Sequence, residues 1–116
     1  MRDRIRILLD ECVHSGMRQA FPGHSVRTVS QAGWRQTKDG PLLTLAESNF
    51  DVFITIDSKL ERENQLEAYH LGFVIVWVPG NQLRHFEPLF ELLQQAAESV
   101  KPGEVIHLSA PKNRRV

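Results

Sequence analysis

The sequence lacks the features that would place the protein in several common classes. It contains one cysteine, Cys12, so no disulfide can form within the chain, and we expect a reducing compartment. No run approaches the roughly 18 consecutive apolar residues that are needed to span a bilayer, and the first residues lead into a strand-like segment rather than a secretory signal. We therefore expect a cytoplasmic protein with no membrane segment.

Several short motifs are also missing. The sequence has no G-x-S-x-G, no Walker-type phosphate loop and no G-x-G-x-x-G, which removes the common serine-hydrolase, P-loop and dinucleotide-binding interpretations. The histidines, at positions 14, 24, 70, 85 and 107, show no H-x-x-x-H or Cys/His spacing. A zinc site is therefore disfavoured.

Charge of one sign is not in excess, because the formal net charge is zero. This neutrality weakens any expectation of strong, non-specific binding to nucleic acid. The distribution is uneven, however: residues 1–40 carry seven Lys or Arg against four Asp or Glu, residues 41–100 carry three against nine, and residues 101–116 carry four against one. A local basic rim for an anionic partner is compatible with this pattern.

What the sequence does contain is a regular alternation of strand-like and helical segments. The strand-like segments are 5–9, 25–29, 52–56, 72–78 (where Trp77 is assigned to the core) and 104–108. The helical segments are 13–21, 39–49 with Asp39 as its cap, 61–70 and 82–99. The 116 residues suit one domain. We predict a doubly wound, Rossmann-like α/β domain with a mostly parallel five-stranded sheet over 1–110, followed by a basic tail over 111–116.

Acidic residues stand where two of these strands end. Asp10 and Glu11 follow the first strand, Asp57 follows the third, and Asp39 begins a helix. In doubly wound sheets the functional crevice lies outside the carboxyl ends of the strands, where the winding direction reverses. Carboxylates that converge there repel one another unless a cation sits among them, and Mg²⁺ and Mn²⁺ prefer oxygen ligands. The sequence therefore predicts a magnesium or manganese site that includes Asp10, Asp57 and Asp39, with Glu11 as a further ligand.

Each of these residues also has a purely structural explanation. Asp10, Asp39 and Asp57 are all placed where an Asp can cap a helix. Trp34 lies in a polar loop, where it could stack on a nucleobase or pack back onto the core. Cys12 is expected to be buried and unreactive, because the two carboxylates that precede it raise its pKa.

Several segments together resemble the short bacterial PIN-like proteins, relatives of the VapC toxin ribonucleases, along nearly the whole chain. The resemblance rests on Ile7-Leu8-Leu9-Asp10-Glu11, Gly33-Trp34, Asp39 with Leu42-Leu43-x-Leu45-Ala46-Glu47, Phe50-Asp51-Val52-Phe53-Ile54-Thr55-x-Asp57, Asn81-x-Leu83 and Pro102-Gly103-Glu104-Val105. It implies a small Rossmann-like sheet whose acids bind Mg²⁺ or Mn²⁺ and hydrolyse RNA. Asp10, Asp39 and Asp57 match the family's acidic positions and are the implied catalytic residues.

The chain departs from the family at one position. A further acid often follows two residues after the third one, and this chain has Lys59 there. The resemblance implies a metal-dependent ribonuclease, the toxin of a toxin–antitoxin pair, with RNA, an antitoxin protein and a second copy of the chain as partners. We expect Lys59, Arg62 and Trp34 to contact the substrate. Two alternatives stay open: a PIN-like module that binds RNA or protein without cutting, and a phosphoacceptor receiver domain.

Overall fold

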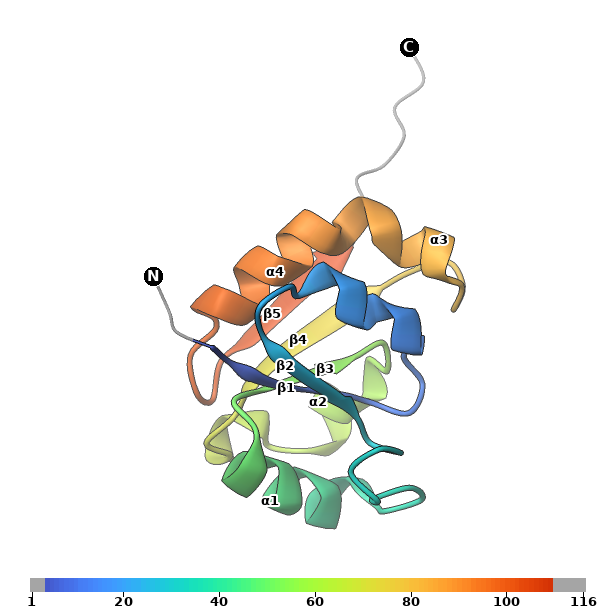
Figure 1. The fold of residues 1–116 in the computed structure, drawn as a ribbon. Helices are drawn as coiled ribbons and strands as arrows, with labels where there is room; N and C mark the ends of the chain where they lie inside the picture. Colours follow the sequence, from blue (N-terminus) through green and yellow to red (C-terminus); the bar gives the residue numbers. More distant parts are fainter. Residues whose placement is uncertain (1–3, 110–116) are drawn as a thin grey trace.

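The structure of the protein, a computed structural model, describes residues 4–109, which form a parallel sheet with helices on both faces (Figure 1). Within this range the strands are β1 (Arg6–Leu9), β2 (Ser25–Thr28), β3 (Val52–Thr55), β4 (Gly72–Trp77) and β5 (Val105–Ser109). Their order across the sheet is β2-β1-β3-β4-β5, and every neighbouring pair is parallel. The predicted doubly wound α/β class with a five-stranded sheet is confirmed.

The strands differ in burial according to their place in the sheet. All residues of β3 are buried, and so are all but the last of β4, as expected for strands that helices cover on both faces. The edge strands β2 and β5 are only partly buried. The near-continuous apolar segments of the sequence therefore became central strands, because only the centre of the sheet removes both faces of a strand from water.

Two groups of helices cover the sheet, one on each face. On the first face lie the 3₁₀ helices η1 (Ser15–Ala20) and η3 (Glu87–Leu89) with the α-helices α3 (Leu83–Phe86) and α4 (Phe90–Ser99). On the second face lie α1 (Asp39–Asn49), α2 (Lys59–Glu63) and the 3₁₀ helix η2 (Leu66–Ala68). Figure 1 shows the two groups on opposite sides of the strands.

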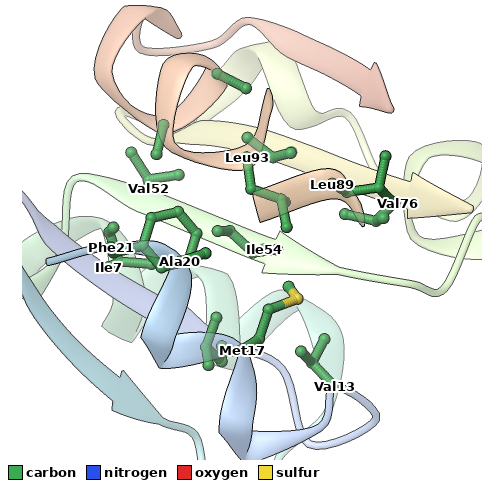
Figure 2. Close-up of a cluster of buried hydrophobic side chains, with 14 of the residues drawn as sticks. Ile7, Val13, Met17, Ala20, Phe21, Val52, Ile54, Val76, Leu89 and Leu93 are labelled. Carbon is green, nitrogen blue, oxygen red and sulfur yellow. The ribbon is translucent and has the colours of Figure 1, made fainter. Parts of the chain in front are cut away.

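The apolar core is divided by the sheet into two layers. Figure 2 shows the first layer, where Met17 and Phe21 from the η1 region and Leu93 from α4 meet Ile7 and Ile54 from the strands. The second layer contains the following buried residues, among others: Leu8, Leu42, Leu43, Ala46, Phe53, Leu60, Leu66, Phe73 and Ile75. Successive residues of a strand point to opposite faces of the sheet, so apolar side chains of the strands pack against helices on both faces.

The helices differ from the predictions in type and continuity. The predicted helix 13–21 is the 3₁₀ helix η1, and the predicted helix 61–70 is two short pieces, α2 and η2. The predicted helix 82–99 is divided into α3, η3 and α4, with Pro88 at the start of the 3₁₀ turn. Proline has no N–H to donate to a carbonyl of the preceding turn, so the α-helical hydrogen-bond pattern is interrupted at Pro88, although Glu87 keeps the αR conformation.

Two assignments of single residues are wrong. Asp39 is not the cap of α1 but its first residue, since Lys38 occupies the cap position and makes no capping bond through its side chain. Trp77 is not in the core: it is 64% exposed at the end of β4. Alternation along β4 gives Trp77 the same face as Ile75, but α1, α2 and η2 leave this end of the face uncovered.

Two predictions concern residues outside the range 4–109. The basic tail 111–116 and the last residue of the predicted domain lie outside the described residues. No helix within residues 4–109 is long and apolar enough to cross a membrane.

Candidate functional site at the carboxyl ends of β1 and β3

Asp10 is held in place where β1 and β3 end side by side. Its backbone N–H donates to the carbonyl oxygen of Ile54 in β3, with an N···O distance of 2.9 Å. One carboxylate oxygen, Oδ2, accepts a hydrogen bond from the hydroxyl of Thr55 at 2.7 Å, and Oδ1 accepts one from the N–H of Glu11 at 2.8 Å. Thr55 is fully buried. A central strand therefore orients the Asp10 carboxylate, and the side chain has little freedom to turn away.

The electrostatic environment of Asp10 disfavours the ionised form of its carboxyl group. Burial raises the pKa of the Asp10 carboxyl above its ordinary value, and the negative charge of Asp39 raises it further by a smaller amount. The hydrogen bonds from Thr55, the Glu11 N–H and Cys12 act in the opposite direction but do not cancel the effect of burial. Ionised Asp10 is thus costly in the protein alone, and a nearby cation would reduce that cost.

Asp39 is placed near Asp10 by the start of α1. Its Oδ2 lies 3.4 Å from Nδ2 of Asn64, which donates to it and also donates to the carbonyl oxygen of Leu60 at 3.0 Å. The start of α1 is therefore linked to the end of α2. The influence of Asp39 on the pKa of Asp10 indicates that the two carboxylates share one electrostatic environment.

Asp57 takes a different position from the one predicted. Its side chain is exposed, and Oδ1 accepts a hydrogen bond from the N–H of Lys59, the first residue of α2, at 2.9 Å. Its own N–H donates to Oγ1 of Thr55 at 3.0 Å. Thr55 therefore connects the Asp10 carboxylate with the backbone of Asp57, while the Asp57 carboxylate stabilises the beginning of α2. This arrangement agrees with the structural explanation that the sequence left open for Asp57.

The Glu11 side chain is engaged by a backbone group of another loop. Its Oε2 accepts a hydrogen bond from the N–H of Gln36 at 2.9 Å, so the side chain holds the loop between β2 and α1. Across residues 4–109 no three His, Cys, Asp or Glu side chains are grouped so that they could hold a metal ion. The predicted convergence of Asp10, Asp39, Asp57 and Glu11 on one ion is therefore not formed.

The remaining pair is still compatible with magnesium. Mg²⁺ keeps several waters and is commonly bound by only one or two carboxylates. The candidates for such a pair are Asp10, which accepts a hydrogen bond from the Thr55 hydroxyl, and Asp39, whose charge acts on Asp10. The chemistry of these donors fits a hard, oxygen-preferring cation in this mode, although it does not fit a cage made by the protein alone.

The predicted substrate contacts are distributed over two elements. Lys59 and Arg62 are exposed on α2. Trp34 packs edge-on against Phe50, with ring centroids 5.8 Å apart and planes at 86°, and belongs to the second core layer. The structure therefore supports the packing explanation for Trp34 over stacking on a base.

A polar cavity beside Asp10 was not predicted from the sequence. It has a volume of about 360 Å³ and is lined by Asp10, Glu11, Val13, Ser15, Thr28, Ser30 and Arg35. A larger cavity of about 520 Å³ lies between the ends of β3, β4 and β5, near Trp77, and contains none of the predicted acids. We consider the smaller cavity the better candidate, because it combines carboxylates, hydroxyls and a guanidinium. The signal for Arg35 in the sequence was its position shortly after β2, at the same edge of the sheet as Asp10.

Cys12 provides a prediction about reactivity at this site. Its Sγ lies 3.5 Å from both Asp10 Oδ2 and Thr55 Oγ1, and burial, assisted by the charge of Asp10, raises the pKa of the thiol. The thiolate fraction is therefore small. We expect alkylation by iodoacetamide at pH 8 to be at least about tenfold slower in the folded protein than in the urea-unfolded chain. Equal rates in the two states would show that the thiol is open to reagents.

The fold and this edge of the sheet define the protein as a doubly wound α/β domain in which Asp10 stands at the β1/β3 switch point, beside a polar cavity at the carboxyl ends of β1 and β2. No family model, curated protein or solved structure matches the chain. The resemblance to PIN-like proteins therefore stays a prediction.

Proposed function

We propose that the protein is a metal-dependent ribonuclease in which Asp10 and Asp39 hold Mg²⁺ or Mn²⁺. The observation that carries this proposal is the state of Asp10, a largely buried carboxylate that is fixed by Thr55 and raised in pKa by burial and by Asp39. A carboxyl group whose pKa is raised by burial, with a second carboxylate close enough to influence it, is typical of sites that bind cations or exchange protons. The position at the carboxyl ends of β1 and β3 is where doubly wound domains bind their ligands.

Several residues of the chain would have separate roles at this site. Thr55 orients the Asp10 carboxylate, and Asn64 holds Asp39. The ion, when bound, supplies Lewis-acid chemistry that activates water and offsets the negative charge of a phosphodiester. Asp57 is exposed and accepts a hydrogen bond from the Lys59 N–H, and the exposed Lys59 and Arg62 would contribute positive charge toward RNA. The same proposal takes an antitoxin protein and a second copy of the chain as partners, as the PIN-like resemblance implies.

The direct test is cleavage of a labelled single-stranded RNA with Mg²⁺, with Mn²⁺ and with EDTA. We expect cleavage with either ion and none with EDTA. The ions should also raise the melting temperature, because a ligand that binds only the folded state stabilises it. A Glu91→Gln variant, at an exposed position of α4, is the matched control and should behave like the unmodified protein. No cleavage and no shift in melting temperature with either ion would contradict the proposal.

A second candidate is a PIN-like module that binds RNA or protein without cutting. It is favoured by the absence, within residues 4–109, of a three-acid group and by Lys59 at a position that is often acidic in the family. RNA binding that is retained in EDTA, with no cleavage under any condition, would support this alternative over the nuclease.

One observation favours the receiver alternative as well. The order β2-β1-β3-β4-β5 is that of flavodoxin-like sheets, which receiver domains share, and Asp57 is exposed as a phosphoacceptor must be. Asp57 lies two residues beyond β3, however, and its carboxylate is engaged by the Lys59 N–H. Incubation with acetyl phosphate followed by mass spectrometry separates the two functions, since only a receiver would become phosphorylated at Asp57.

A further inference from the structure

We propose that Arg35 binds a phosphate group of the nucleic acid in the polar cavity beside Asp10, and that Glu11 positions Arg35 through the backbone of Gln36. This inference rests on the proposed ribonuclease function, because it concerns the substrate of the same site. It gives Glu11 a role in substrate binding instead of the role of metal ligand that the sequence suggested.

The chemistry of the cavity matches a phosphate that approaches a carboxylate. Among residues 4–109, Arg35 is the one cationic side chain that lines this cavity, and the hydroxyls of Ser15, Thr28 and Ser30 line it as well. Guanidinium groups bind phosphate oxygens through two parallel hydrogen bonds, and hydroxyls can donate to the oxygens that remain. Because Asp10 and Glu11 both line this cavity, an anion can enter only where positive charge offsets their carboxylates. Arg35 provides that charge from the protein side.

The loop that carries Arg35 is anchored on both sides of it. On one side, Trp34 packs against Phe50, and its N–H donates to the carbonyl oxygen of Val29 at 3.0 Å. On the other side, the N–H of Gln36 donates to Glu11 Oε2 at 2.9 Å. Arg35 thus projects from a short span with two fixed ends, which reduces the conformational freedom that an exposed arginine would lose on binding.

The backbone conformation of Gln36 supports a functional role for the hydrogen bond between Gln36 and Glu11. Gln36 has φ of 61°, and it is the only non-glycine residue with positive φ within residues 4–109. This conformation is unfavourable for a residue with a side chain, and such strain persists where surrounding contacts enforce it. The hydrogen bond that the Gln36 N–H donates to Glu11 Oε2 is a contact that helps to hold Gln36 in this conformation. Glu11 follows Asp10 directly, so the anchor couples the position of Arg35 to the end of β1.

The test compares three variants with a matched control. Arg35→Gln removes the guanidinium, Glu11→Ala removes the acceptor for Gln36, and Glu11→Gln keeps an acceptor oxygen without the charge. Arg27→Gln is the control, because Arg27 is an exposed arginine on β2 that lines a different cavity. Each protein is assayed for KM and kcat on single-stranded RNA, and for RNA binding as a function of salt.

We expect Arg35→Gln to weaken RNA binding and raise KM roughly tenfold, as for the loss of a hydrogen bond to a charged group. The slope of log affinity against log salt should fall by about 0.7, as for one phosphate contact on a single strand. Glu11→Ala should raise KM in the same direction, whereas Glu11→Gln should stay close to the unmodified protein. The control should match the unmodified protein in every assay.

The outcomes separate this inference from the proposed function. If the unmodified protein cleaves RNA but Arg35→Gln keeps the same KM and salt slope, the inference fails and the nuclease proposal stands. If Glu11→Gln loses activity and the dependence of the rate on Mn²⁺ concentration shifts, Glu11 is a metal ligand and its positioning role is wrong. If the unmodified protein neither binds nor cleaves RNA, both proposals fail.

Discussion

Replacing Asp10 with Asn should lower kcat/KM for metal-dependent RNA cleavage by about 10²–10³-fold, the loss that follows removal of one preorganised electrostatic group. Asn has nearly the same shape as Asp and keeps an acceptor oxygen for the Glu11 N–H, so the strand ends should stay intact. What is lost is the negative charge that attracts the cation. The measurements are RNA cleavage with Mn²⁺ and the shift in melting temperature that Mn²⁺ produces, which should disappear together.

The same substitution should stabilise the protein in the absence of metal, and this effect depends on pH. Burial raises the folded-state pKa of Asp10, so the folded protein binds this proton more tightly than the unfolded chain does. The ionised carboxylate therefore lowers the free energy of unfolding at neutral pH, and this penalty disappears as the pH falls through the folded-state pKa. Asp10→Asn should be more stable than the unmodified protein at pH 7, and this difference should shrink on acidification.

Two measurements make the prediction specific to Asp10. Urea unfolding at pH 7 and at pH 4 gives the stability difference at each pH, and Glu91→Gln on α4 should show neither the loss of cleavage nor the gain in stability. Unchanged cleavage in Asp10→Asn would remove Asp10 from the catalytic site. A loss of stability at pH 7 would show that the bond between Thr55 and the carboxylate outweighs the cost of burial.

Replacing Phe53 with Ala should lower the free energy of unfolding by about 3–5 kcal/mol. Phe53 is fully buried in β3, the central strand of the sheet, and packs edge-to-face on Phe73 with ring centroids 6.2 Å apart. Truncation removes the buried ring and leaves a cavity that the strands on either side cannot close. Domains of this kind are stable by only about 5–15 kcal/mol, so the change is a large share of the total.

The matched control for Phe53 is Trp77, an aromatic residue at the end of the neighbouring strand. Trp77 is 64% exposed, so Trp77→Ala should cost less than about 1 kcal/mol. Urea unfolding monitored by circular dichroism measures both variants. A cost for Trp77→Ala that equals the cost for Phe53→Ala would mean that the end of β4 is covered in solution, by a second copy of the chain or by residues beyond Ser109.

The sequence by itself determined the architecture of this protein. Apolar segments such as 52–56 and 72–78 have to be buried on both faces, and alternation with helical segments leaves a parallel, doubly wound sheet as the arrangement that achieves this. The break of the last predicted helix was not predicted, although Pro88 lacks the N–H that a continuous α-helix needs at this position. The position of Asp10 at the end of a strand followed from the same pattern.

The tertiary structure alone decided which of the acids act together. The sequence placed Glu11 and Asp57 beside strand ends, but their side chains are taken up by backbone N–H groups of Gln36 and Lys59. Hydropathy assigned Trp77 to the core, although the helices of its face stop short of it. The spacing of apolar residues in the sequence predicts which positions are buried. The direction of a polar side chain depends instead on hydrogen-bond partners that loops bring from elsewhere in the chain. For that reason Arg35 became visible as a neighbour of Asp10 only after the chain was folded.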